Sequence, residues 1–433
     1  MTHDASINDS STTNHLGNPT SPAHDPSVFA SLVHDAQALD PELRDLRREI
    51  HRHPEIGLDL PLTQASIITR LNKLEGLEIS TGTRQSSVTA VLRGAAPYQG
   101  ERPVVLLRGD MDALPVTEET GLDFSSEIDG AMHACGHDLH VAGLYGAARL
   151  LHARRDQLTA DVIFMFQPGE EAYHGARYMV EDGVLQAAGR TVDQAYGLHV
   201  FSMLHDNGVF LSRPGTLMAG CEEIFVTVHG AGGHGSIPHL AKDPVPVAAE
   251  IIVALQSLVT RGYNVFDPVV ATVGRLESGT AGNVIPDTAT MDISLRLFSP
   301  ANKEKLIKDV VRLVEGIASA HGLHASYSLA PDYPVTVNND VEHRFAQDTI
   351  TSLFGAEAFQ ELEHPLTGSE DFSHVLNEVP GAYLLLGAKI GDSTETNHSP
   401  RADFDEAVLP RAAAALAALA LTRPAWQDPA VHP

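Results

Sequence analysis

Short apolar runs that alternate with helical segments place the strongest limit on the folds open to this chain. The runs are PVVLLR (103–108), DVIFMF (161–166), AYGLHV (195–200) and AYLLLGA (382–388). Apolar runs of this length are typical of strands that are covered on both faces. Helical patterns occupy residues 40–53, 139–155 and 170–183. Strands that alternate with helices predict an α/β domain with an open, mostly parallel sheet.

The middle of the chain has a different order of elements. Residues 219–330 read as strand, helix, strand, strand, helix, strand, which is the order of the ferredoxin-like α+β motif. The α/β pattern resumes afterwards, so the smaller domain is predicted to be inserted into the larger one. We expect a disordered leader at 1–30, the first part of the larger domain at 31–218, the inserted domain at 219–330 and the second part at 331–433.

The charge balance limits the possible partners. The chain has 29 Lys and Arg against 56 Asp and Glu, for a formal net charge of −27. Such a surface repels nucleic acid and anionic membranes, so neither is expected as a partner. Two cysteines are too few for a disulfide framework, and the first 30 residues lack the pattern of a signal peptide. We therefore expect a cytoplasmic protein.

Polar side chains follow the predicted strands at their carboxyl ends, where ligands bind in open α/β sheets. Asp110 and Asp112 follow the first strand, Glu170 and Glu171 follow the second, and His199 and His398 belong to the third and fourth. The stretch HACGHD (133–138) precedes a helix for which Asp138 is the expected N-cap. Five segments should therefore bring a thiol, imidazoles and carboxylates to one crevice.

Each of these residues taken alone has a structural interpretation, because lone cysteines and histidines are usually core residues. Their joint placement at strand ends favours a metal site instead, and the candidate ligands are Cys135, His137, Glu171, His199 and His398. Five ligands exceed the needs of one catalytic metal, so two divalent ions that share a bridging group are predicted, with zinc, manganese, cobalt or nickel all compatible. Glu170, next to a ligand, is then the expected general base.

Several ordered motifs give the chain a family resemblance between about Leu43 and Leu409. They are LRREIHRHPEIGLDLPLT, LLRGDMDALPVTEETGL, MHACGHDLHVAGL, FQPGEEAYHGARYMVEDGVL, GLHV, GGHGSIPHLAKDP, GTAGNVIPDTATMDISLRLF, GSEDFS and NHSPRADFDE. With these motifs the sequence resembles the dinuclear-metal amidohydrolases of the aminoacylase and carboxypeptidase superfamily, which include N-acyl-amino-acid amidohydrolases, hippurate hydrolases and auxin-conjugate hydrolases.

The resemblance implies roles that the residues alone do not show. Cys135 would bridge the two metals, and the larger domain would be catalytic. The inserted domain would mediate a homodimer in which His234 reaches the site of the other subunit and stabilises the oxyanion. Asn283 would help to hold the substrate carboxylate. Asp110 and Asp112 would support the ligands rather than bind metal directly.

The expected function is that of a metal-dependent amidohydrolase that uses a metal-activated water to split an N-acyl amino acid into its acyl group and the free amino acid. A dipeptidase or carboxypeptidase with the same metal site is one alternative, and a non-catalytic protein that binds acyl amino acids is another. Three further features are not assigned a catalytic or metal-binding role. His51-x-His53 ends a helix and is expected to be structural or to line the active site. Ser236 lies outside a G-x-S-x-G motif and is not expected to be a nucleophile, and Cys221 is expected in the core.

Overall fold

The computed structural model describes residues 26–203 and 205–423. Its main sheet has eight strands in the order β1-β2-β4-β3-β5-β16-β6-β15. Their bounds are β1 Glu78–Thr81, β2 Val88–Leu92, β3 Val104–Asp110, β4 Asp161–Gln167, β5 Gln194–Phe201, β6 Phe210–Ser212, β15 Phe359–Glu361 and β16 Gly381–Gly387. The central strands β4, β3, β5 and β16 are parallel, which confirms the predicted strands and the mostly parallel sheet.

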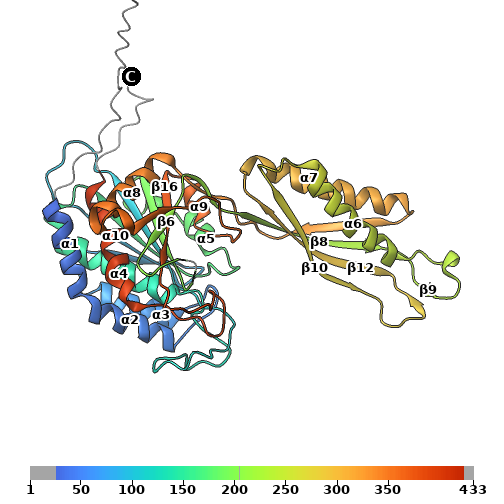
Figure 1. Ribbon diagram of the computed structural model, residues 1–433, viewed down its shortest axis with the longest axis horizontal. Coiled ribbons are helices and arrows are strands. Elements are labelled where there is room, and N and C mark those ends of the chain that lie inside the picture. Colours follow the sequence, from blue (N-terminus) through green and yellow to red (C-terminus); the bar gives the residue numbers. More distant parts are fainter. Residues whose placement is uncertain (1–25, 204, 424–433) are drawn as a thin grey trace, which may run out of the picture.

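Helices cover both faces of this sheet (Figure 1). Along β3, Val105 and Leu107 point into one core, whereas Val104 and Leu106 point into the other. The first face carries α1 Pro26–Ala38, α2 Asp40–Arg52, α3 Pro61–Leu71, α4 His137–Ala153, α8 Asp340–Phe354 and α10 Leu409–Thr422. The second carries the short helices α5 Gly175–Glu181 and α9 Ser373–Leu376. Two covered faces explain why the central strands lack polar alternation.

Small residues bring α4 close to α10. A Cβ atom at Gly146 would lie only 2.6 Å from the Cβ of Ala413, and one at Gly143 would lie 3.2 Å from the Cβ of Ala412. The alanine-rich sequence of α10 therefore fits the glycines of α4. This contact fixes α4, whose first turn lies at the carboxyl ends of β3 and β5.

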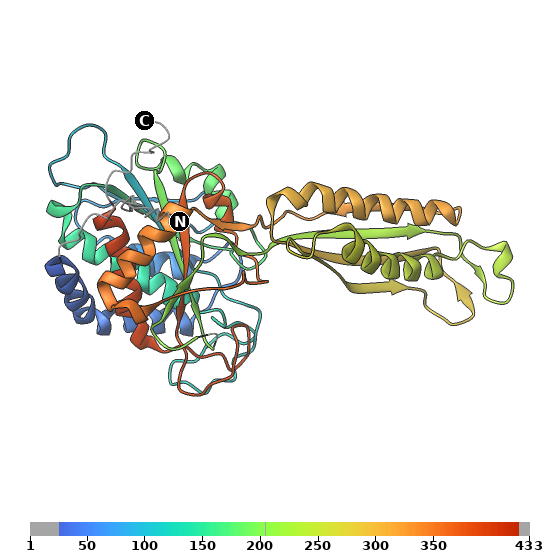
Figure 2. The same cartoon turned by 45° about the horizontal axis from the view of Figure 1, so that its top comes forward.

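A second lobe holds a four-stranded antiparallel sheet in the order β10-β12-β8-β13 (Figures 1 and 2). Its elements are β8 Gly220–His229, α6 Pro244–Gly262, β10 Val269–Ser278, β12 Thr288–Leu297, α7 Pro300–Ala320 and β13 His324–Leu329. This is the predicted β-α-β-β-α-β order. Both helices pack on one face of the sheet around their own hydrophobic core, which includes Ile251 and Val310.

Helix α6 is, within the described residues, the one helix whose length and composition would allow it to cross a membrane. Length and composition alone are weak evidence for a span. Its buried residues Val247, Ala248, Ile251 and Leu255 belong to the hydrophobic core against the sheet, as expected for the core-facing side of a helix.

The two lobes meet at a pair of crossing strands. Chain segments β7 Gly215–Met218 and β14 Thr336–Asn338 form a small antiparallel sheet, and Cys221 pairs with Tyr333 in an isolated bridge just beyond it. A two-stranded antiparallel sheet, β9 Gly233–His234 with β11 Val284–Ile285, lies at the end of the second lobe that is farthest from the main sheet (Figures 1 and 2).

Three local predictions were wrong. The predicted leader included residues 26–30, but these begin α1, where Phe29 is buried in the core; residues 1–25 lie outside the described part. The helix predicted at 170–183 is confined to α5, because Ala172 and His174 adopt left-handed φ angles of 68° and 57°. Asp138 is not an N-cap: the cap of α4 is the left-handed Gly136, and Asp138 lies within the helix.

Candidate metal centre

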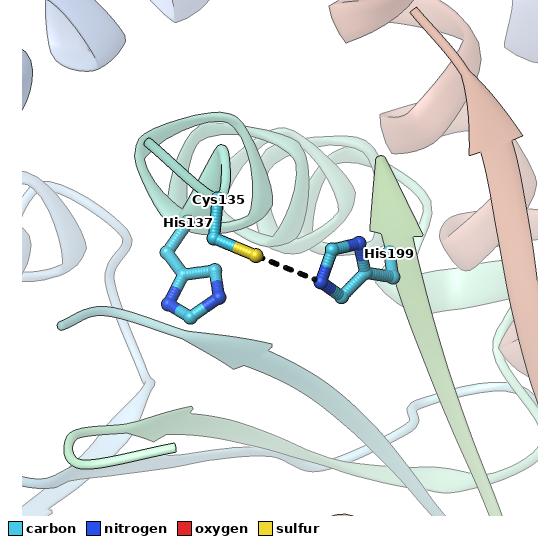
Figure 3. A group of neighbouring side chains, drawn as sticks. All are labelled: Cys135, His137 and His199. Carbon is cyan, nitrogen blue, oxygen red and sulfur yellow. Dashed lines mark hydrogen bonds between the residues drawn. The ribbon is translucent and has the colours of Figure 1, made fainter. Parts of the chain in front are cut away.

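The predicted ligands come from separate elements and meet at the carboxyl end of the main sheet. Cys135 lies in the turn before α4, His137 is the first residue of α4, and His199 lies near the end of β5 (Figure 3). Glu171 follows β4, and His398 lies in the loop after β16 with a left-handed φ of 71°. The structure thus brings together all five residues, although they span more than half of the chain.

Two ligand groups share the thiol of Cys135. One group is Cys135, His137 and His199, and the other is Cys135, Glu171 and His398; within each, the possible ligand atoms lie within 4.8 Å of one another. The Cys135 Sγ atom lies 3.4 Å from His199 Nε2 and 3.3 Å from His398 Nε2. His398 Nε2 is also 3.1 Å from Glu171 Oε1. One thiolate between two groups is the arrangement that a bridged pair of metal ions needs.

Hydrogen bonds fix the tautomer of His199. Its Nδ1–H donates to the carbonyl of Val200 at 2.8 Å, so the lone pair of Nε2 faces Cys135. Burial and the neighbouring ring of His140 lower the pKa of His199 well below its usual range. The imidazole is therefore neutral, which is the form that binds a metal.

His140, which sequence reasoning missed, supports the site through the protein instead of offering a nitrogen to a metal. Its Nε2 accepts a hydrogen bond from the backbone N–H of Val200 at 2.8 Å, and its Nδ1 donates to Asp110 at 2.5 Å. Both ring nitrogens are thus occupied by protein groups. His140 follows His137 by three residues on α4, and this i, i+3 spacing is the signal that could have identified it. It orients β5 and Asp110 around the ligands.

Asp112 shapes the loop that carries Glu170 and Glu171. Its two carboxylate oxygens accept the backbone N–H groups of these residues at 2.9 and 3.0 Å. The hydroxyl of Tyr333 donates to the backbone carbonyl of Glu170 at 2.7 Å. The two glutamates are consequently fixed by their backbone, and their side chains, together with His137, form a further cluster of possible ligand atoms.

The site concentrates negative charge in a buried place. Burial and the carboxylates of Glu370 and Glu171 raise the pKa of Glu170 well above its usual range. Contacts with Cys135 and Glu171 raise the pKa of His398 to about 10. A buried acidic cluster of this kind favours cations, and it gives Glu170 a high affinity for a proton.

A divalent metal ion fits the donor set. His137 is fully buried, yet neither of its ring nitrogens has a hydrogen-bond partner among the described residues. Its Nε2 lies 3.5 Å from Asp110 and its Nδ1 lies 3.5 Å from Asp112. A buried imidazole without hydrogen-bond partners is costly unless a ligand satisfies it. Thiolate, imidazole and carboxylate together suit a borderline-soft divalent ion.

A cavity of about 390 Å³ opens onto these residues. Cys135, Glu170, Glu171, His199 and His398 line one side of it. The second lobe contributes Cys221, Glu223 and Arg296 to the lining, and Cys221 and Arg296 are cross-strand neighbours. Cys221 is therefore a cavity residue and not the core residue that was predicted. Arg296, which sequence reasoning also missed, is the only Arg or Lys among the described lining residues.

His234 and Asn283 do not join this cluster within the chain. Both are exposed at the far end of the second lobe, where His234 belongs to β9 and Asn283 directly precedes β11 (Figures 1 and 2). The backbone N–H of Ser236 donates to His234 Nδ1 at 3.1 Å, and the Ser236 hydroxyl lies 2.9 Å from the same nitrogen. This leaves the proton of His234 on the outward Nε2.

Comparisons with known proteins place this geometry in context. The model of peptidase family M20/M25/M40 matches residues 106–422. IAA-amino acid hydrolase ILR1-like 5 of Arabidopsis thaliana is 37% identical over 403 residues, covering 91% of this chain and 89% of that protein. Thermostable carboxypeptidase 1 of Saccharolobus solfataricus is 35% identical over 400 residues, covering 91% and 98%. The crystal structure of the Bacillus subtilis YXEP protein, a dinuclear metal binding peptidase, superposes with a TM-score of 0.75 at 31% identity, covering 89% and 98%.

Proposed function

The chain belongs to peptidase family M20/M25/M40 and is a metal-dependent hydrolase of amide bonds, and we propose that its substrates are N-acyl amino acids, which it splits into a carboxylic acid and an amino acid. The observation that carries the proposal is the thiol of Cys135, shared by two groups of ligand atoms beside Glu170. His137 and His199 belong to the first group, and Glu171 and His398 belong to the second.

Each residue has a role in this proposal. Two divalent ions at the shared thiol would activate a water molecule and polarise the amide carbonyl. Glu170 takes the proton of the water and later gives it to the leaving nitrogen, for which its buried, acidic surroundings suit it. Asp112 and Asp110 hold the glutamate loop and His140 in place. Arg296, the cation of the cavity wall, pairs with the carboxylate of the amino acid.

The identity of the metal follows from the ligands only in part. A set of one thiolate, three imidazoles and one carboxylate accepts zinc, manganese, cobalt or nickel. We propose a metal-reconstitution series in which the purified protein is stripped with a chelator and reloaded with each ion. The ion that restores the highest rate at equal metal content is the preferred one.

The test of the proposed function is the variant Glu170→Gln. It should lose nearly all hydrolysis of N-acetyl amino acids while retaining two metal ions per chain, because Glu170 moves the proton and the five ligands remain. Glu363→Gln, at an exposed position, is the matched control and should behave as wild type. Near wild-type turnover by Glu170→Gln would overturn the role of the base. Wild-type protein that binds metal and hydrolyses no acyl amino acid would favour a binding protein.

A carboxypeptidase or dipeptidase activity at the same site is the second candidate function. The relative from Saccharolobus solfataricus that is named a carboxypeptidase favours it. Arg296 serves equally for the carboxylate of a peptide, so the site chemistry does not separate the two. Rates on matched N-acetyl, N-benzoyl and dipeptide substrates separate them directly. Faster cleavage of dipeptides would replace the first proposal with this one.

We also propose a homodimer formed through the second lobe. Strand β10 is an edge of its sheet, and apolar side chains lie exposed nearby, including Val253 at 69%, Val265 at 76% and Phe266 at 93% exposure. An open strand edge beside exposed apolar groups supports pairing with a second copy. Two free cysteines support a cytoplasmic location, which is part of the same proposal.

The dimer gives His234 and Asn283 their proposed roles. Each lies far from the cluster in its own chain, so each can act only at the site of the partner, His234 by donating from Nε2 to the oxyanion and Asn283 by holding the carboxylate. Mixing inactive His234→Ala with inactive Glu170→Gln subunits should restore part of the activity, since one site in a mixed dimer has both residues. Subunit exchange without recovered activity would contradict this arrangement.

A further inference from the structure

A second cavity of about 390 Å³ adjoins the cavity of the candidate metal centre. The two share the lining residues Ala172, Cys221, Glu223 and Tyr333, so they meet around these side chains. The other lining residues of the second cavity are Leu58, Tyr173, His174, Tyr178, Ala330 and Pro331. None of the predicted ligands lines it, so it has a different character from the first cavity.

The walls of the second cavity are aromatic and apolar. Tyr173, Tyr178 and Tyr333 line it, and the ring of His174 lies 4.5 Å from that of Tyr333 between centroids. Burial lowers the pKa of His174, which favours the uncharged form of this ring. No Lys or Arg occurs among the described lining residues, whereas Glu223 adds a carboxylate. Such walls suit an uncharged ring and disfavour a second carboxylate.

The segment between the two cavities is strained. Ala172 and His174 both have left-handed φ angles, which are unfavourable for a non-glycine residue. This backbone allows residues 170 and 171 to line the first cavity while residues 173 and 174 line the second. The ring of Tyr173 covers Gly57, where a Cβ atom would lie 3.2 Å from it. The wall is therefore fixed by packing.

We infer that the second cavity is a specificity subsite that receives an aromatic or similarly bulky apolar group of the substrate. The scissile amide lies at the candidate metal centre, and the carboxylate pairs with Arg296 in the first cavity. This inference rests on the proposed function and names the substrate group that the site selects. The ring belongs either to the acyl group or to the side chain of the amino acid, because both flank the scissile bond.

The test measures kcat/KM of the metal-loaded, full-length protein on four substrates. They are N-acetyl-alanine, N-phenylacetyl-alanine, N-acetyl-phenylalanine and N-phenylacetyl-phenylalanine. The variant Ala330→Phe fills the second cavity from a half-buried position on the second lobe. Its matched control is Ala320→Phe, the same change at an exposed position in the last turn of α7.

The inference predicts that wild type prefers at least one ring-bearing substrate over N-acetyl-alanine. Ala330→Phe should lower kcat/KM for that substrate by about tenfold or more, the scale for steric loss of an apolar pocket, and leave N-acetyl-alanine within about twofold. The substrate whose kcat/KM falls shows whether the acyl group or the side chain occupies the cavity. Ala320→Phe should match wild type on all four substrates.

A second variant keeps the test decisive if Ala330→Phe folds poorly. Tyr173→Ala removes an aromatic wall from a residue that is 43% exposed, so folding should tolerate it. It should raise KM for the ring-bearing substrate and leave N-acetyl-alanine unchanged. Equal effects of the variants on all four substrates would overturn the subsite. Absence of hydrolysis of any of the four by wild type would instead count against the proposed function.

Discussion

Replacement of Arg296 by alanine should weaken the recognition of a substrate carboxylate. Arg296 lies on β12, and its Nη1 donates to the hydroxyl of Ser369 at 2.6 Å and to the carbonyl of Thr367 at 3.3 Å. A guanidinium has five N–H donors, so these contacts orient the group and leave further donors for a ligand. The side chain lines the same cavity as the predicted metal ligands.

The expected loss follows from the chemistry of the pair. A hydrogen bond to a charged group contributes about 1.5–3 kcal/mol. At about 1.4 kcal/mol for each factor of ten, its removal should lower kcat/KM by about 10- to 150-fold. The loss should apply only to substrates with a carboxylate, because Arg296 is not placed to contact the scissile amide.

The assay is a cycle of two proteins and two substrates. Wild type and Arg296→Ala are each measured on N-acetyl-alanine and on N-acetyl-alaninamide, which has the same shape without the charge. The coupling between the two changes reports the arginine–carboxylate interaction free of other effects. Arg275→Ala, at a 56% exposed position on β10, is the control and should show no coupling.

A coupling near zero would refute the reasoning. If Arg296→Ala lowers kcat/KM equally for both substrates, the arginine maintains the cavity wall and another group binds the carboxylate. If the variant leaves both rates unchanged, Arg296 does not face bound substrate at all. Either result would also remove the main support for an amino acid as the leaving group.

Three further predictions concern the supports of the site and fold. Asp112→Asn replaces one of two carboxylate acceptors for backbone N–H groups with a donor, and it should lower kcat/KM by about 10- to 100-fold at measured metal content; an unchanged rate would contradict this. Gly146→Ala places a Cβ atom 2.6 Å from that of Ala413, so the free energy of unfolding should fall by about 1–3 kcal/mol in denaturant titrations. A rise in this free energy would show that α10 shifts to accommodate the methyl group. Burial opposes the ionisation of Glu118, but hydrogen bonds, led by that of His51, lower its pKa from 4.5 to about 2. Wild type should therefore be more stable than Glu118→Gln above pH 4.5 and should lose this advantage as the pH falls towards 2. A pH-independent difference between these two proteins would show that the carboxylate is not the cause.

The central sheet could be predicted because its strands carry a simple signal. All positions of β3 are buried and its first four, Val104 to Leu107, are apolar, since each face of the sheet meets a helical layer. The outer strands β1, β6 and β15 have only three or four residues, and β1 is largely exposed. A strand of this kind is specified by its neighbours in the sheet and leaves little periodicity in the sequence.

The site could be predicted as far as strand ends determine it. Glu171, His199 and His398 stand after or near the ends of parallel strands, and topology alone brings such ends together. The helix predicted at 170–183 and the N-cap predicted at Asp138 were wrong because the backbone there adopts uncommon conformations. Gly136, Ala172 and His174 are left-handed, and for the two non-glycine residues no sequence pattern signals this. The surrounding contacts impose it.

The roles of residues whose surroundings depend on the position of the second lobe could not be predicted from the sequence. Cys221 reads as a core residue because the strand pattern around it is that of a half-buried strand, yet its side of β8 faces the cavity. The same bridge that pairs Cys221 with Tyr333 places the Tyr333 hydroxyl on the carbonyl of Glu170. A shift of the second lobe at this bridge would therefore move both the wall that carries Arg296 and the backbone of the proposed base. The substrate binding proposed for Arg296 and the proton transfer proposed for Glu170 would then be linked through the hydrogen bond between Tyr333 and Glu170, which are 163 residues apart.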